Sequence, residues 1–306
     1  MNRHAYLIMA HNNFYNLEHL LKTLDYEEND IYLHIDKKAK EFDELYFSNL
    51  TSKAKTHIYS EIKTNWGGYS LVECELFLLS EAYKNGKYFY YHLLSGADLP
   101  IKKHADIMRF FEQNAGYEFV QFRDQFFNGR KKEISRRVSL YYWIQEYRGI
   151  SKNEMVKAVL RYIAKGLLGL QVLFRVDRLK NKNIELKYGS QWFSISQEFT
   201  QYLLENRKRI QEIFNNTLCP DEFVIQTMLY NSDFKTRIYQ GLPGIDERSA
   251  NLREIDWDRS KDATHPYTWR QEDFWSLKES ELLFARKFDE NVDKTIIDQI
   301  YAWVRE

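Results

Sequence analysis

Short apolar segments that end in polar residues, with helical segments between them, constrain the fold of this chain more than any other feature. Ala5–Ala10 and Ile31–Ile35 read as buried strands, and Asn16–Leu24 between them carries apolar residues at helical spacing. Tyr88–Leu94 repeats the strand pattern further along. This alternation is typical of an α/β fold with a largely parallel sheet flanked by helices. Because the 306 residues contain no repeat or linker, we expect a single domain over residues 1–306.

A polar residue follows each of these three predicted strands. His11 comes after the first, Asp36 after the second, and Asp98 a few residues after the third. In open α/β sheets, ligands bind outside the carboxyl ends of the strands. We therefore expect these side chains to line a binding site, where His11 and Asp36 could hold a nucleoside.

The second half of the chain continues the mixture of strands and helices. Glu118–Phe122 and Trp192–Ile195 have strand patterns, and Glu198–Asn206 has a helical pattern. Pro220 is typical of a first helical position, because its ring fixes φ and it has no amide proton to donate. In the last third we expect one strand and two helices, over His265–Trp269, Glu279–Phe288 and Thr295–Val304.

The acidic pair Asp221-Glu222 follows Pro220 and lies in the first turn of the predicted helix. Two interpretations are open. Acids in a first turn ordinarily complement the helix dipole and accept from free N–H groups. A carboxylate at a helix start can also present a general base to a cleft.

Three cations of the last third could neutralise a diphosphate. Arg286 and Lys287 are expected at the end of the helix 279–288, where cations are ordinary partners of the dipole, and Arg270 precedes them. Such cations are needed if no metal ion balances the charge of a leaving diphosphate.

The carboxylates offer little for a metal ion. The strand 88–94 is the plausible place for an Asp-x-Asp pair that would hold Mg²⁺ or Mn²⁺, yet it is followed by the single carboxylate of Asp98. A literal Asp256-Trp257-Asp258 lies late in the chain. The histidines have no metal-ligand spacing, so these residues favour neither a metal site nor another cofactor.

Residues 130–187 form a basic, largely helical segment. It carries 15 Lys and Arg against 5 Asp and Glu, although the chain as a whole has no net charge. Within it, Val156–Phe174 is apolar at helical spacing. This helix either packs on the main domain or lies on the surface and contacts anionic lipid. The second interpretation suits an acceptor held on a lipid carrier.

Other function classes lack their motifs. The chain has neither a Gly-x-Gly-x-x-Gly nor a Walker-type Gly-Lys-Ser/Thr sequence, which weighs against dinucleotide and ATP binding, and no nucleic-acid partner is expected. Cys74 and Cys219 provide no disulfide framework and fit a reducing compartment. The sequence has no recognisable signal peptide and no apolar run of roughly 18 residues, so we expect a cytoplasmic enzyme.

Seven short motifs, taken together and in this order, resemble those of the core-2/I-branching enzyme family, glycosyltransferase family 14. That family contains β-1,6-N-acetylglucosaminyltransferases and peptide O-xylosyltransferases. The resemblance runs almost from end to end of the chain and depends on Ala5-Tyr-Leu-Ile-Met-Ala-His11, Tyr32-Leu-His-Ile-Asp-Lys37, Trp66-Gly-Gly-Tyr-Ser-Leu-Val-Glu73, Leu94-Ser-Gly-Ala-Asp-Leu-Pro-Ile-Lys102, Gly189-Ser-Gln-Trp-Phe193, Pro220-Asp-Glu222 and Leu283-Phe-Ala-Arg-Lys-Phe-Asp289.

The resemblance implies a GT-A-like fold, a UDP-sugar donor, an inverting mechanism and no required metal. Glu222 corresponds to the catalytic base and Lys287 to the diphosphate-binding lysine of the family. The stretch His265–Arg270 is shorter than in the animal branching enzymes, so either Arg270 or Arg286 is expected to assist Lys287. The remaining assignments are His11 and Asp36 near the uridine, and Asp98, Trp192 and Trp257 on the acceptor side.

The expected function is therefore metal-independent, inverting transfer of a sugar, with N-acetylglucosamine or xylose first, to a hydroxyl of a glycan or lipid-linked saccharide. The expected setting is bacterial surface polysaccharide synthesis, in the cytoplasm or peripherally on the inner face of the membrane. Two alternatives stay open. One is a metal-dependent GT-A transferase of another family, which Asp256-Trp-Asp258 would support, and the other is a non-catalytic glycan-binding protein.

Overall fold

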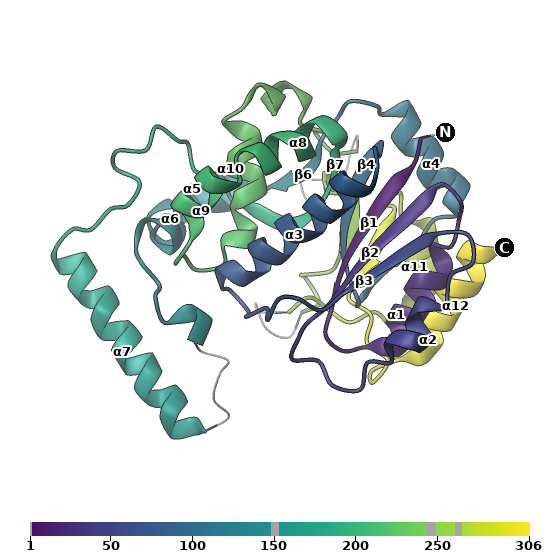
Figure 1. Cartoon of the computed structure of the whole chain (residues 1–306), viewed down its shortest axis with the longest axis horizontal. Helices are drawn as coiled ribbons and strands as arrows, with labels where there is room; N and C mark the ends of the chain where they lie inside the picture. Colours follow the sequence, from purple (N-terminus) through teal and green to yellow (C-terminus); the bar gives the residue numbers. More distant parts are fainter. Residues whose placement is uncertain (1, 148–152, 243–248, 261–264) are drawn as a thin grey trace.

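The computed structural model describes residues 2–147, 153–242, 249–260 and 265–306. Its central sheet has six strands in the order β3-β2-β1-β4-β7-β6 (Figure 1). The strands β1, β2, β3 and β4 are parallel, whereas β7 is antiparallel to both β4 and β6. The predicted α/β class with a largely parallel sheet is confirmed. The strands are β1 His4–Ala10, β2 Asn29–Ile35, β3 Lys55–Tyr59, β4 Tyr90–Ser95, β6 Phe119–Phe122 and β7 Gly189–Ser196.

Helices cover both faces of this sheet, and the alternation of side chains along β1 shows why (Figure 1). Tyr6 and Ile8 belong to one apolar core, and Ala5 and Leu7 belong to the other. The first core includes α1 Phe14–Thr23, α4 His104–Gln113, α11 Phe274–Glu279 and α12 Lys294–Arg305. The second includes α3 Tyr69–Asn85, α8 Gln197–Glu205, α9 Arg207–Phe214 and α10 Val224–Tyr230.

A second sheet of three short strands lies in the order β5-β9-β8, with β5 Asp98–Pro100, β8 Arg253–Ile255 and β9 Phe284–Arg286. The predicted helix 279–288 is therefore wrong. Helix α11 ends at Glu279, and Phe284 and Ala285 are buried on β9, which pairs with β5 on one side and β8 on the other. The closing helix predicted at 295–304 is confirmed as α12.

Two other predicted elements differ locally. Residues 265–269 form no extended strand in the described part of the chain, because Pro266 lacks an amide proton and the segment bonds to separate partners. Its Tyr267 amide donates to the Asp256 carbonyl and its Trp269 amide to the Lys287 carbonyl. Pro220–Glu222 form a 3₁₀ turn, η2, rather than the first turn of an α-helix, because α10 begins only at Val224.

The basic segment follows α5 Asp124–Gly129. It contains α6 Lys131–Ser139, the 3₁₀ turn η1 Gln145–Tyr147 and α7 Glu154–Leu173. Residues 148–152 of the segment lie outside the described residues, and residues 174–188 form turns and extended chain rather than helix. Helix α7 lies at the margin of the molecule (Figure 1), and among its residues Gln171 alone is buried. No helix in the described part of the chain has the length and apolar character required to cross a membrane.

Candidate active site

The site is built at the edge of the sheet where β1, β2 and β4 end. Ala10 and Ile35 are paired at the ends of β1 and β2, and Met9 is paired with Ser95 at the end of β4. Because β7 runs antiparallel to β4, its first residues reach the same edge. One end of the sheet therefore gathers residues from four strands and the loops that follow them.

His11, Asp36 and Lys287 form the first group of predicted residues. Partial burial lowers the pKa of His11, with Lys287 acting in the same direction and the Asp36 carboxylate opposing them, so the three side chains lie within electrostatic range. Asp36 is buried and its carboxylate accepts from the Lys38 amide (2.7 Å) and the Thr64 amide (3.1 Å). These bonds tie the loop after β2 to the loop after β3.

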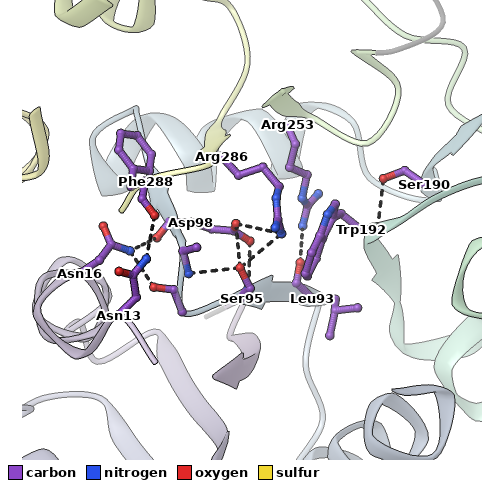
Figure 2. Close-up of polar contacts among 12 residues, drawn as sticks. Asn13, Asn16, Leu93, Ser95, Asp98, Ser190, Trp192, Arg253, Arg286 and Phe288 are labelled. Atoms are coloured by element: carbon purple, nitrogen blue, oxygen red, sulfur yellow. Dashed lines mark hydrogen bonds and ion pairs between the residues drawn. The ribbon is translucent and has the colours of Figure 1, made fainter. Parts of the chain in front are cut away.

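Asp98, Arg286 and Trp192 form the second group (Figure 2). Asp98 and Arg286 face each other on β5 and β9, and Arg286 Nη1 lies 3.3 Å from Asp98 Oδ1. The Arg286 guanidinium also lies over the Trp192 ring, 4.3 Å from its centroid. Ser95 donates to Asp98 through its amide (2.7 Å) and its hydroxyl (2.9 Å). Burial raises the pKa of Asp98 and Arg286 opposes this. Asp98 is buried, so its carboxylate faces Arg286 rather than solvent.

Two asparagines fix the loops around this group (Figure 2). Asn13 donates to the Phe288 carbonyl (2.8 Å), and Asn16 donates to the carbonyls of Gly96 (2.8 Å) and Asp98 (3.2 Å). Buried amides of this kind stabilise a single loop arrangement, because each broken bond would leave a polar group unsatisfied. Lys287 is thereby held between Arg286 and Phe288 at the sheet edge.

Arg253 on β8 is fully buried beside Arg286 (Figure 2). The pairing of β4 with β7 covers only Tyr90–His92 of β4. The Arg253 guanidinium donates to the carbonyl just beyond this pairing on each strand, at Leu93 and Phe193. Its Nη2 donates to Phe193 O (2.6 Å) and Leu93 O (3.2 Å). Burial lowers its pKa to about 9, with Asp98 and Tyr6 opposing, so it is a cation at neutral pH. Arg253 thus supplies the donors for two carbonyls beyond the end of the ladder between β4 and β7, next to Arg286.

Glu222 lies in η2, which contacts β7. Its Oε2 accepts from Arg137 Nη2 at 2.6 Å, and a third of its side chain remains exposed. The Arg137 guanidinium lies over the rings of Tyr188 (5.5 Å) and Phe223 (5.4 Å), so the arginine is itself fixed. The carboxylate is therefore accessible and oriented.

The neighbouring Asp221 is less accessible than Glu222. It is buried, and burial together with the Glu222 charge raises its pKa to about 7. Glu75 lies close enough to Asp221 for each charge to disfavour the other, and burial raises the Glu75 pKa well above its usual value. Of the two candidates in Asp221-Glu222, Glu222 is the one suited to accept a proton from a substrate.

Trp257 and Arg270 are the remaining predicted residues. Neighbouring residues link each of them to these groups, because the Arg123 amide donates to the Tyr188 carbonyl and the Trp269 amide donates to the Lys287 carbonyl. The Arg123 guanidinium lies 5.4 Å from the Trp257 ring centroid. The charge of Arg123 also acts on Tyr188, so Trp257 lies toward Tyr188. Arg270 is exposed and its amide donates to Asp273 Oδ2 (3.0 Å) at the start of η5 Gln271–Asp273.

The described residues contain no cluster of three or more His, Cys, Asp or Glu side chains that could hold a metal ion. The Asp256 carboxylate accepts from Arg259 Nε at 2.5 Å and from the Asp258 amide at 2.9 Å. Arg259 also pairs with Asp273 at 2.7 Å. The literal Asp-x-Asp sequence thus stabilises a surface turn through its first carboxylate.

Arg137 and Arg253 are the site residues that sequence reasoning missed. Arg137 is 85 positions from Glu222 in sequence, and nothing in the pattern of α6 distinguishes it from neighbouring cations. Arg253 did carry a signal, because a cation beside an apolar strand residue is unusual unless the fold supplies it with partners.

Comparison with known proteins supplies the family. The model of the Core-2/I-Branching enzyme family matches residues 4–279. Xylosyltransferase oxt of Drosophila melanogaster is 24% identical over 311 residues, covering 93% of this chain and 31% of that protein. Xylosyltransferase 2 of Rattus norvegicus is 22% identical over 326 residues, covering 97% of this chain and 33% of that protein. The chain thus spans about a third of the length of these relatives.

Two solved structures align with about three quarters of the chain. Mouse xyloside xylosyltransferase 1 in its apo form covers 74% of this chain and 82% of its own, with 10% identity and a TM-score of 0.33. Core-mannan synthase A from Aspergillus fumigatus in its Mn/GDP form covers 75% of this chain and 70% of its own, with 12% identity and the same TM-score of 0.33.

Proposed function

Because the chain belongs to the Core-2/I-branching enzyme family, we propose that it is a glycosyltransferase that moves a sugar from a UDP-sugar to an acceptor hydroxyl. The observation that carries this proposal is the accessible carboxylate of Glu222, held by Arg137 beside the start of the strand whose Trp192 contacts Arg286. A base and a cationic surface near one strand end suit a reaction in which a proton is accepted and a diphosphate leaves.

In the proposed mechanism, Glu222 accepts the proton of the acceptor hydroxyl while its oxygen attacks the anomeric carbon. The bond from that carbon to the UDP oxygen breaks on the opposite face, and UDP leaves with the bonding electrons. An α-linked donor therefore gives a β-linked product, by the logic of inverting glycosidases. Since Arg137 binds Oε2, we expect Oε1 to face the hydroxyl.

The cations act on the donor side of this reaction. Lys287 and Arg286 stabilise the charge that builds on the diphosphate, and their loops are already fixed before substrate binds. Asp98 positions Arg286 and does not itself contact the substrate. His11 and Asp36 are proposed to lie near the uridine, which places the nucleoside at the ends of β1 and β2.

Trp192→Leu is expected to raise the donor KM about fivefold, because a partly buried cation–π contact contributes roughly 1 kcal/mol and Arg286 would keep only its contacts with Asp98 and Ser95. Initial rates over a series of UDP-sugar concentrations measure this effect. Trp275→Leu, on the exposed side of α11, is the matched control and should keep the KM of the unmodified protein. Equal KM values for the two variants would contradict the role of Trp192.

Metal independence is the second kinetic expectation. Transfer in excess EDTA should stay within about twofold of the untreated rate, because cationic side chains are available to neutralise the diphosphate. Asp98 and Asp256 are already engaged by Arg286 and Arg259, which supports this expectation. A loss of transfer that Mn²⁺ restores would favour the metal-dependent alternative and return attention to those two carboxylates.

The proposed sugar is xylose first and N-acetylglucosamine second. Proteins named xylosyltransferases match almost the whole chain, which supports xylose, although the chain spans only about a third of their length. The proposed acceptor is a glycan or a lipid-linked saccharide in bacterial surface polysaccharide synthesis, on the cytoplasmic side of the membrane where UDP-sugars are available.

A thermal-shift panel in EDTA with UDP, UDP-xylose and UDP-N-acetylglucosamine tests donor binding. Stabilisation follows RT ln(1 + [L]/Kd), so millimolar ligand reports even a weak site. A shift with UDP and one UDP-sugar supports the proposal and identifies the sugar for transfer assays. No shift with or without Mn²⁺ would contradict it in favour of a glycan-binding protein.

A further inference from the structure

Helix α7 exposes an unusual amount of apolar surface. It lies outside the helices that flank the sheet (Figure 1), and its apolar side chains point largely to solvent. The four most exposed in α7 and its C-cap, with between 72% and 76% of their surface accessible, are Met155, Tyr162, Leu173 and Phe174. Contiguous apolar surface of this kind is typical of an interaction site.

Helix α7 has a cationic side, an exposed apolar side and a narrow buried contact between them. Residues three and four apart share a face, so Lys157, Arg161 and Lys165 form one polar stripe. The exposed apolar residues lie on the opposite side. Between these two sides, Gln171 bonds the amide (2.7 Å) and carbonyl (3.0 Å) of Tyr141, which fixes the helix to the rest of the segment.

A cationic hollow adjoins the C-terminal end of α7. It has a volume of about 340 Å³ and lies between α6 and the end of α7. Lys132, Arg136 and Arg175 line it, with Asp177 as its single acid, and Val172 of α7 forms part of its wall. A site for an anionic headgroup therefore adjoins Leu173 and Phe174, the most exposed apolar residues at this end of the helix.

We propose that α7 and this hollow dock the protein on the surface of an anionic lipid bilayer. The apolar face of α7 would enter the boundary between headgroups and acyl chains. The stripe of Lys157, Arg161 and Lys165, whose face continues to Val172 in the hollow, would lie among the charged headgroups. Lys132, Arg136 and Arg175 would bind lipid phosphates. Lipid rather than a second copy of the chain fits the charge, because two copies would bring together two segments that each carry 15 Lys and Arg against 5 Asp and Glu.

The docking segment also reaches the candidate active site. Helix α6 supplies Lys132 and Arg136 to the hollow and Arg137 to Glu222. A saccharide attached to a lipid in the same bilayer would therefore be presented next to the base. This consequence rests on the proposed function, whereas the docking itself does not.

Sedimentation of the full chain with lipid vesicles tests the docking. Vesicles of pure phosphatidylcholine are compared with vesicles that contain about a third phosphatidylglycerol, at low and high salt, because exposed charges are screened by salt. We expect binding to the anionic vesicles, weakened at high salt. The double variant Leu173→Asp/Phe174→Asp should reduce the bound fraction at least tenfold. The double variant Lys132→Gln/Arg175→Gln removes two positive charges from the hollow and should also reduce the bound fraction.

Leu45→Asp is the matched control, because Leu45 is as exposed (76%) but lies on α2 Glu44–Ser48, far from α7 in the chain. It should bind vesicles as the unmodified protein does, and circular dichroism verifies that all variants are folded. Equal vesicle binding by the α7 double variant and the control would overturn the proposal. So would dimerisation without lipid that the α7 double variant abolishes. A UDP-induced thermal shift in the α7 double variant separates a failure of docking from a failure of the proposed function.

Discussion

Glu222→Gln is expected to abolish sugar transfer while donor binding is retained. The amide keeps the size of the side chain and can still contact Arg137, but it cannot accept the proton of the acceptor hydroxyl. A positioned general base contributes roughly 10²–10⁴-fold to a rate, so kcat should fall by about that factor. Single-turnover transfer measures the chemical step, and the UDP-induced thermal shift measures donor binding.

Glu212→Gln on α9 is the matched control, since Glu212 is an exposed glutamate outside the site, and it should keep the full rate. Asp221→Asn is a second comparison. Because Asp221 is buried and Glu222 is partly exposed, Asp221 is not expected to reach the acceptor hydroxyl, and the rate of this variant should exceed that of Glu222→Gln. Transfer by Glu222→Gln at the rate of Glu212→Gln would refute the assignment.

Arg253→Met is expected to destabilise the protein by about 3 kcal/mol or more. Methionine fills similar space but leaves Leu93 O and Phe193 O without donors in the core, and each unsatisfied buried acceptor costs roughly 1–3 kcal/mol. It also removes a cation that lies near the buried carboxylate of Asp98. Urea denaturation of the two proteins, followed by circular dichroism, measures the difference in free energy of unfolding.

Arg109→Met on α4 is the control for loss of an arginine as such. Arg109 is exposed and pairs with Asp106 within one helix, so its substitution should change stability by about 0.5 kcal/mol or less. If Arg253→Met unfolds at the same urea concentration as Arg109→Met, the guanidinium does not connect β4 and β7 as described.

The parallel half of the fold was readable from sequence because its physical signal is local. The strands β1, β2 and β4 are buried apolar segments, and each ends before a polar residue that lies at the sheet edge. The proximity of His11 and Asp36 follows from the rule that parallel strands end at the same edge. The family assignment used the same segments, because several of its short motifs lie at these strand ends and occur in a fixed order along the chain.

The second sheet was not readable, because its signal is not local. The segment 284–286 has an apolar spacing compatible with a helix, and its extended form depends on partners at 98–100 and 253–255. The pairing of Asp98 with Arg286 follows from that register, so it was missed together with the strand. The contact between Arg137 and Glu222 was missed for the same reason, since it joins distant segments and leaves no periodicity.

The first residues of β7 have a consequence for how substrate range can change. Tyr188, just before the strand, lies beside the arginine that holds the base, and Trp192 lies under Arg286 on the donor side. Four residues of extended chain span about 13 Å, a length set by covalent geometry. Gly189 locks the register, because a Cβ there would lie 1.9 Å from the Gln121 carbonyl oxygen. In the proposed mechanism, the strand is thus a spacer of fixed length between proton acceptor and leaving group. Relatives with other acceptors should then differ in the surrounding loops and keep this spacing.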